Sequence, residues 1–311
     1  MASPQAGTLP WHYLQLVSCH GEANDTMDSL PEFSESRVNY ILVFSGAFNP
    51  PHIGHLNFMR ESLLNAGHDL HIVGALFDLR SDYWLREHKH SDMILPHATR
   101  SRMMREDTRM PVDARVLSWD AYGLEHFKSI AARREVRVRF IQLLSAELDL
   151  DLDNPVRDWP RHFDGLLVNT YGRHGPATHS VPSLNRDPWT ALHEPGDTVH
   201  RHQRMVTNEK GSIKGFLRVV TRGPDEKKSL ISSSGIKNLA RVLSDHEIAE
   251  SDILRTAVLG WSTIVQEEIW VNWRAVQASK PIAGDFQQAK EMLERDLREA
   301  CELEERNFRD E

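Results

Sequence analysis

Cysteine and long apolar runs are the two features this sequence has least of. It contains 2 cysteines, Cys19 and Cys301, which lie far apart and in no C-x-x-C pair, so a disulfide framework is not expected. No stretch approaches the roughly 20 apolar residues of a membrane-spanning helix, and the first residues lack the basic region and apolar core of a secretory signal. These absences predict an intracellular protein, cytoplasmic or nuclear, without a membrane partner.

An excess of positive charge is also missing. The formal net charge is −8, and because phosphate backbones select basic surfaces, we expect no general nucleic-acid partner. Hydrophobic residues make up 40% and charged residues 26% of the chain, as in ordinary globular proteins rather than disordered ones. The 311 residues are enough for one large α/β domain with decorations or for two small domains.

One stretch, residues 43–56, is the most informative part of the sequence and reads VFSGAFNPPHIGHL. Residues 39–44 are apolar and β-branched like a buried strand, whereas residues 56–66 repeat apolar side chains at helical spacing. The stretch is therefore predicted to contain a loop between a strand and a helix. Such a junction at the edge of a parallel sheet collects phosphate, because strand ends, loop amides and a helix N-terminus converge there.

The residue types in this loop suit a nucleotide. Gly46 permits close backbone approach, and His52 and His55, three residues apart, can aim both imidazoles at one anion from a single helical turn. Gly54 between them leaves room for a base or a ribose. Two other interpretations stay open: both histidines are ordinary loop residues, or they are half of a zinc site, which would need further ligands.

Two motifs resemble those of a known family. The stretch GAFNPPHIGHL is similar to the first motif of the nucleotidyltransferase superfamily with H-x-G-H, and most of all to that of the nicotinamide mononucleotide (nicotinate-nucleotide) adenylyltransferases. Residues 229–239, SLISSSGIKNL, resemble the second signature of that family, I-S-S-T-x-I-R, at a helix N-terminus. Hydroxyls, free amides and a cation one turn into a helix suit polyphosphate oxygens, although a serine-rich N-cap alone is common. Ser234 replaces the threonine and Lys237 the arginine, and lysine does not reproduce a bidentate fork.

The resemblance implies a fold and a reaction. The fold is a Rossmann-like α/β nucleotidyltransferase domain over residues 38–275, with a mostly parallel sheet and flanking helices. The reaction is transfer of the AMP moiety of ATP to a mononucleotide, first of all nicotinamide mononucleotide, which forms NAD and pyrophosphate with Mg²⁺ bound to ATP. Residues 1–37 are then an N-terminal extension, residues 174–204 an insertion or mobile flap, and residues 276–311 a charged helical segment. ATP and the mononucleotide are the expected partners, and a homo-oligomer stays open.

The resemblance also implies roles for single residues. The implied catalytic residues are His52, His55 and Lys237. The residues implied to hold ATP and its phosphates are Ser45, Gly46, Phe48, Asn49, Gly54, Ser232, Ser233 and Ser234. The residues implied to hold the acceptor are Trp119, Trp159, Glu147, Asp149 and Arg173. No protein residue is expected to ligate a metal.

Two segments depart from the family pattern. The family has a Gly-x-Asp-like turn where residues 145–149 read SAELD, and the side chain of Ala146 could crowd a ligand there. Asp120 replaces the family's glutamate after Trp119, and both Trp119 and Trp159 could instead be core residues. A related transferase that uses CTP or another phosphorylated acceptor is therefore a second hypothesis. A nucleotide-binding protein that has lost turnover is a third.

Two charged helices are predicted outside the motifs. Residues 98–107 form a basic pattern around Arg100, which resembles only loosely a family helix that begins with His-Arg, because Thr99 precedes Arg100. A solvated basic face and a phosphate-binding face are both open for this helix. Residues 285–309 follow a charged helical pattern with few apolar positions, which is typical of a peripheral or partner-binding helix.

Overall fold

The computed structural model describes residues 33–89, 94–110, 114–117, 121–145, 162–171, 184, 188–192, 199–207, 210–222, 231–261 and 286–309. The chain splits into two compact units, each drawn from separate stretches of sequence. The first, Met1–Ser45, Met59–Asp78 and Pro111–Glu226, is called the sheet unit below. The second, Gly46–Phe58, Leu79–Met110 and Lys227–Glu311, is called the helical unit.

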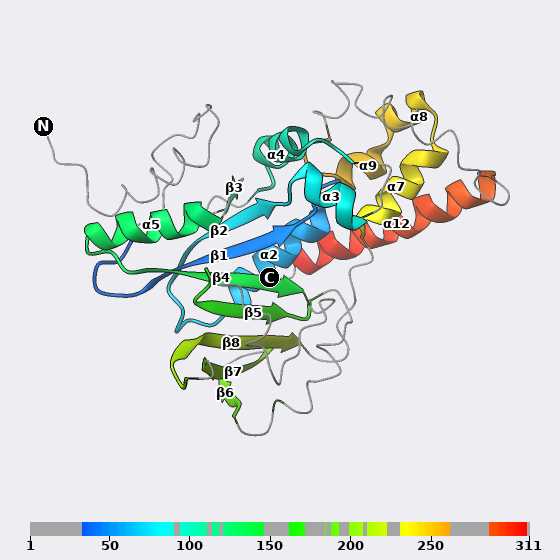
Figure 1. Cartoon of the computed structure of the whole chain (residues 1–311). Coiled ribbons are helices and arrows are strands. Elements are labelled where there is room, and N and C mark those ends of the chain that lie inside the picture. The colour runs from blue at the N-terminus through cyan, green and yellow to red at the C-terminus, as the bar shows by residue number, and fades with distance from the viewer. Residues whose placement is uncertain are drawn as a thin grey trace, which may run out of the picture. The chain divides into compact units, whose positions relative to one another are not determined.

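The described strands belong to one sheet. They are β1 (Asn39–Gly46), β2 (Ile72–Leu79), β3 (Ala114–Leu117), β4 (Val138–Ser145), β5 (Gly165–Asn169), β6 (Thr190–Leu192), β7 (Val199–Thr207) and β8 (Ile213–Arg222). Their order across the sheet is β3-β2-β1-β4-β5-β8-β7-β6 (Figure 1). The pairs β2–β3, β1–β4, β4–β5 and β5–β8 are parallel, and β7 pairs antiparallel with both β8 and β6.

This strand order confirms the predicted fold class. The chain builds outward from β1 to β3 on one side and then returns to β4 beside β1, which is the 3-2-1-4-5 arrangement of a Rossmann-like sheet. The reversal of direction lies between β1 and β4, and the carboxyl end of β1 runs directly into the GAFNPPHIGH loop. In folds of this class, ligands bind at the carboxyl ends of the strands beside this reversal.

The centre of the sheet is apolar on both faces. Ile41, Leu42 and Val43 of β1 are each at most 3% exposed, and a run of consecutive buried residues is expected of a central parallel strand. Ile41 and Val43 belong to the same buried cluster as the apolar residues of helix α5 (Ala121–Arg133), which covers this face of the sheet. The apolar runs that predicted these strands are therefore the ones that form the core.

A buried arginine holds the end of helix α2 (Ile53–Asn65) in the sheet unit. Arg218 of β8 is fully buried, and its guanidinium donates to the carbonyl oxygen of Ala66 just past the helix. The same group donates to both carboxylate oxygens of Asp69, at 2.8 and 2.5 Å, and to Gln203. Partial burial raises the pKa of Asp69, but the hydrogen bonds and charge of Arg218 outweigh it, so that the pKa lies below its ordinary value.

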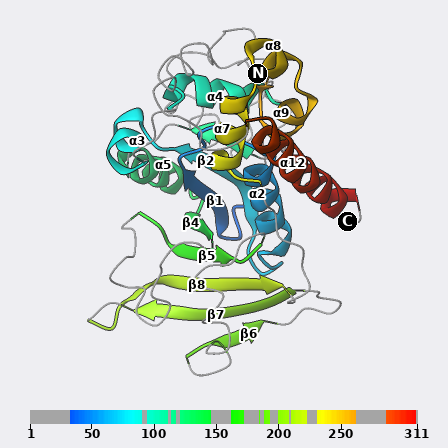
Figure 2. The ribbon, with the colours of Figure 1, turned by 90° about the vertical axis from the view of Figure 1, so that its right-hand side faces the viewer.

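The antiparallel edge of the sheet corrects the mobile-flap alternative for part of residues 174–204 and leaves the insertion open. Residues 190–192 and 199–204 were expected in an insertion or mobile flap, whereas they form β6 and most of β7 (Figure 2). β7 pairs with β8 over its whole length, and its Arg201 and His202 are buried. Most residues of β7 are polar (VHRHQRMVT), so the sequence lacks the alternation of apolar residues that would have predicted a strand.

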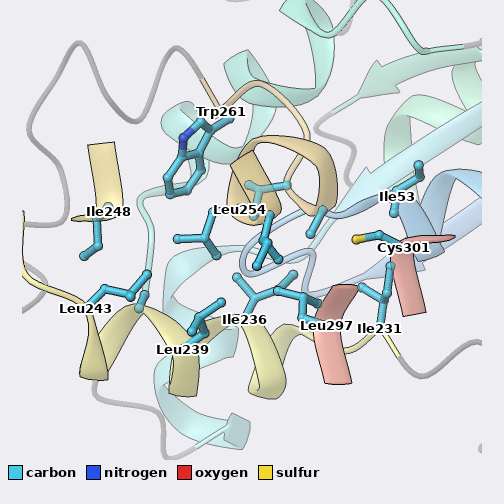
Figure 3. Packing of buried hydrophobic residues seen from close by; sticks show 14 of the residues in the cluster. Ile53, Ile231, Ile236, Leu239, Leu243, Ile248, Leu254, Trp261, Leu297 and Cys301 are labelled. Atoms are coloured by element: carbon cyan, nitrogen blue, oxygen red, sulfur yellow. The ribbon is translucent and has the colours of Figure 1, made fainter. Parts of the chain in front are cut away.

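The helical unit has a core of its own. Its helices are α3 (Asp82–Lys89), α4 (His97–Glu106), α7 (Ser233–Val242), α8 (Asp245–Glu250), α9 (Asp252–Ala257) and α12 (Phe286–Arg309), together with the first residues of α2. Side chains of α7, α8, α9 and α12 point toward one another and fill the space between these helices (Figure 3). The labelled members are Ile53, Ile231, Ile236, Leu239, Leu243, Ile248, Leu254, Trp261, Leu297 and Cys301.

Helix α12 is less peripheral than its charged sequence indicates. Leu297, Ala300 and Cys301 are buried on one side of it, in the same cluster as residues of α7 and α9. Lys290 near its start forms an ion pair with Glu247 of α8, which lowers the pKa of Glu247 to about 2. Among the described helices, none combines the length and the apolar character needed to cross a membrane.

Candidate functional site

The loop after β1 is held together by its own side chains. Phe48, at a φ of 43°, is fully buried, and its ring meets the imidazole of His55 edge-on with centroids 4.9 Å apart. A Cβ at Gly46 would lie 2.9 Å from the ring of Phe48, so the glycine makes room for this ring. Asn49 is buried and accepts a hydrogen bond from the backbone N–H of Leu95 at 2.9 Å. Three predicted ligand-binding residues therefore also set the shape of the loop.

The two motif histidines form a stacked pair. The ring centroids of His52 and His55 are 3.6 Å apart, with 28° between the ring planes. The backbone N–H of His52 donates to Nδ1 of His55 at 3.2 Å, which uses the Nδ1 lone pair and puts the ring proton of a neutral His55 on Nε2. His52 is buried, whereas His55 is only partly so. The two imidazoles therefore lie side by side, and their joint action on one anion stays a prediction.

The second motif begins helix α7 and contacts the first. Ser232 is the N-cap residue, and its hydroxyl oxygen accepts the N–H of Gly235 at 3.1 Å. The hydroxyl of Ser233 donates to the carbonyl oxygen of Pro50 at 3.1 Å, across 183 positions of sequence. This bond brings together, within one compact unit, the two motifs that the sequence singled out separately.

The hydroxyls of this motif are already partly engaged. Ser233 uses its single hydroxyl proton on Pro50, so in this structure it keeps only lone pairs for other groups. Ser234 is exposed in the first turn of α7, and Lys237 is half-buried one turn further on. The first turn of a helix carries amide protons and the positive end of the helix dipole, which together favour an anion there.

The position of Arg100 overturns both interpretations of the basic helix for this one residue. Arg100 lies in α4 and is fully buried, so that its side chain neither faces solvent nor lies open to phosphate. Its guanidinium donates to the carbonyl oxygens of Leu95, Ala47 and Arg80, at 2.9, 2.6 and 2.8 Å, and to the carboxylate of Asp82 at 2.8 Å. Burial lowers the pKa of Arg100, and Asp82 counteracts that shift.

No periodic pattern in the sequence could have identified this role. Arginine fixes irregular backbone because its planar group has five donors in a rigid fork. Arg100 thereby ties the motif loop, through Ala47, to the segment that follows β2 and to the start of α4.

The predicted residues divide into three groups. Gly46, Phe48, Asn49, His52, His55, Ser232, Ser233 and Lys237 belong to the helical unit together with Gly54 and Ser234. Ser45 ends the part of β1 that belongs to the sheet unit, one residue before Gly46. The predicted acceptor residues Trp119, Trp159, Glu147, Asp149 and Arg173 lie outside the described residues.

Comparison with known proteins adds no assignment. No protein-family model matches the chain, and no curated protein matches it either.

Proposed function

We propose that this protein transfers the AMP moiety of ATP to a mononucleotide, with nicotinamide mononucleotide as the first candidate, so that NAD and pyrophosphate form. The observation that carries the proposal is the hydrogen bond from Ser233 to Pro50, because it joins the histidine-bearing loop to the start of α7. Two potential anion-binding elements thereby meet in one unit: an imidazole pair and a capped helix N-terminus. A triphosphate is an anion long enough to use both.

The reaction needs no covalent intermediate with the protein. A phosphate oxygen of the mononucleotide attacks the α-phosphorus of ATP in line, and the bond from that phosphorus to the β-phosphate oxygen breaks. Positioning and stabilisation of charge then supply most of the catalysis. Nε2–H of His55 is suited to donate to an oxygen of the reacting phosphate, with its ring held by His52 and Phe48.

The departing pyrophosphate would be held at the start of α7. The positive end of the helix dipole and Lys237 would stabilise its negative charge. Mg²⁺ would arrive bound to the phosphates of ATP, since it commonly keeps several waters and takes few protein ligands at such sites. Within the described ranges no group of three or more His, Cys, Asp or Glu is placed to hold a metal ion.

A second candidate is a related transferase that uses CTP or another phosphorylated acceptor. The specific observation behind it is the sequence of residues 145–149, SAELD, which has no glycine, whereas the corresponding turn of the family that the chain resembles has one. A third, a nucleotide-binding protein without turnover, is favoured by the engaged hydroxyl of Ser233 and by lysine at position 237.

The test is pyrophosphate release by the purified protein with Mg²⁺, ATP and nicotinamide mononucleotide, beside a CTP reaction and a panel of other phosphorylated acceptors. Release that requires ATP and nicotinamide mononucleotide supports the first proposal. Release only with CTP or another acceptor replaces it with the second candidate. ATP binding without any release supports the third.

A further inference from the structure

A short strip of chain, residues 258–260, holds the backbone of the motif histidine. His52 forms an isolated antiparallel bridge with Val258. One position on, the N–H of Leu259 donates to the carbonyl oxygen of Pro51 at 3.1 Å. The position of His52 therefore depends on where this strip lies. Both belong to the helical unit.

An ion pair just past the end of α4 holds the same strip. Arg109 donates from Nη2 to the carbonyl oxygen of Val258 at 2.9 Å and from Nη1 to that of Thr256 at 2.6 Å. Asp107 accepts the N–H of Gly260 at 2.7 Å through Oδ2. The pair is itself bidentate, with Arg109 Nε at 2.9 Å from Oδ1 and Nη2 at 2.8 Å from Oδ2. Two side chains thus fix two backbone groups of the strip, at Val258 and Gly260, and one just before it, at Thr256.

The strip also has no room to move toward α4. Gly260 has a φ of +59°, and a Cβ there would lie 2.2 Å from the carbonyl oxygen of Met103. The side chain of Asp107 is 6% exposed. Burial raises the pKa of Asp107, but the hydrogen bonds from Arg109 and from the N–H of Gly260 outweigh it, and the pKa lies below its ordinary value. The carboxylate is therefore ionised at neutral pH.

We propose that Asp107 and Arg109 are positioning residues for His52: they fix the Val258–Gly260 strip, and the strip fixes the imidazole against a bound nucleotide. This inference rests on the proposed function. Its physical basis is that displacing a reacting group by about 1 Å can cost roughly 100-fold in rate. In this proposal the role is exerted through Val258, which Arg109 holds and which bridges to the backbone of His52.

A double-mutant cycle tests the coupling. Arg109→Gln removes the charge and the fork, and Arg109→Lys keeps a charge for Asp107 while losing the fork that spans two carbonyls. We expect Arg109→Gln to lower kcat by about 10- to 100-fold with little change in KM for ATP, and Arg109→Lys to have a smaller effect in the same direction. In a His52→Ala background neither change should lower the residual rate further, because the group being positioned is absent.

The matched control is Arg255→Gln. Arg255 pairs with Asp252 on the surface of α9, in the same unit, and should leave kcat unchanged. All rates are compared at a temperature at which circular dichroism shows each variant folded. Effects of Arg109 and His52 that multiply in the double variant would overturn the proposal, as would an unchanged kcat in both Arg109 variants.

A second readout separates this inference from the proposed reaction. Histidine-selective NMR should show the ring resonances of His52 displaced in Arg109→Gln and in Arg109→Lys, while those of His126 on α5 stay in place. A wild-type protein without transferase activity, but with displaced His52 resonances in the variants, would refute the reaction and support the positioning. Resonances of His52 that do not move would overturn the positioning, whether or not the wild type is active.

Discussion

Two buried arginines, one in each unit, make similar hydrogen bonds but hold different kinds of backbone. Arg218 in the sheet unit and Arg100 in the helical unit are both fully buried. Each binds a carboxylate at 2.8 Å, Asp69 in one case and Asp82 in the other, and each donates to main-chain carbonyl oxygens. What differs is the backbone they hold.

Arg218 holds the end of a regular helix, whereas Arg100 holds an irregular loop that carries the candidate site. The sheet around Arg218 would keep its strand pairing through its own ladder of hydrogen bonds. The loop at Ala47 has no such ladder, so side-chain donors fix its shape instead. We therefore expect changes near Arg218 to lower stability, and changes near Arg100 to lower turnover.

The largest contrast is expected between two histidines. His55→Ala removes the donor that we propose for the reacting phosphate and should lower kcat by about 100- to 1,000-fold. His126→Ala, on the exposed side of α5 in the sheet unit, should leave kcat unchanged. Steady-state pyrophosphate release measures both variants. Equal rates for His55→Ala and the wild type would remove the histidine pair from the chemistry.

The next contrast compares the arginines through conservative changes. Arg100→Lys keeps the charge but loses the fork that reaches three carbonyls, so we expect kcat to fall by about 10- to 100-fold. Arg102→Lys, two positions along α4 and partly exposed, is the matched control. If Arg100→Lys leaves kcat intact while Arg102→Lys lowers it, α4 contributes through its exposed face and the comparison fails.

Arg218→Met should instead act on stability. It leaves the carbonyl oxygen of Ala66 without its buried donor and should lower the free energy of unfolding by about 1–3 kcal/mol. Urea unfolding measures this loss, with Arg139→Met, an exposed change in β4, as the control. The kcat of the folded variant should match the wild type, and a loss of kcat comparable to that of Arg100→Lys would erase the distinction between the units.

The smallest effect is a pH dependence in the sheet unit. The pKa of Asp69 lies below its ordinary value of 3.8 in the folded protein, so ionisation favours folding. The stabilisation of the folded state by ionised Asp69 is fully present above pH 3.8 and is lost as the pH falls through the pKa of Asp69 in the folded protein. Asp69→Asn should lower the free energy of unfolding by about 0.2–1 kcal/mol at pH 7, because Asp69 is half exposed. The difference between the two proteins should shrink below pH 3.8, and a difference that grows there would contradict the assignment.

The parts of the fold that the sequence predicts are those with a simple period. Apolar runs mark β1, β2, β4, β5 and β8, and helical spacing marks α2 and α5. Strand β7 was missed because its buried positions include Arg201 and His202, whose polar atoms a hydropathy pattern places outside. The buried side of α12 was missed for a related reason. A few apolar residues are enough to pack this helix into the core, although most of its residues are charged or polar.

The candidate site follows the same division. The two motifs were identified from residue types and spacing, and the structure brings His52, His55 and the start of α7 into one unit. The supporting residues Arg100, Asp107 and Arg109 were not predicted to have this role, because their partners are backbone carbonyls and amides. Such contacts depend on the path of the chain and leave no periodic trace in the sequence.

The most direct test of AMP transfer follows the α-phosphorus of ATP. The wild-type protein would be incubated with Mg²⁺, nicotinamide mononucleotide and ATP labelled at the α-phosphate, and the labelled products separated and quantified against pyrophosphate. The proposal predicts that the label enters a dinucleotide in amounts equal to the pyrophosphate released. Label that stays in ATP, or that appears in ADP or AMP alone, would contradict it.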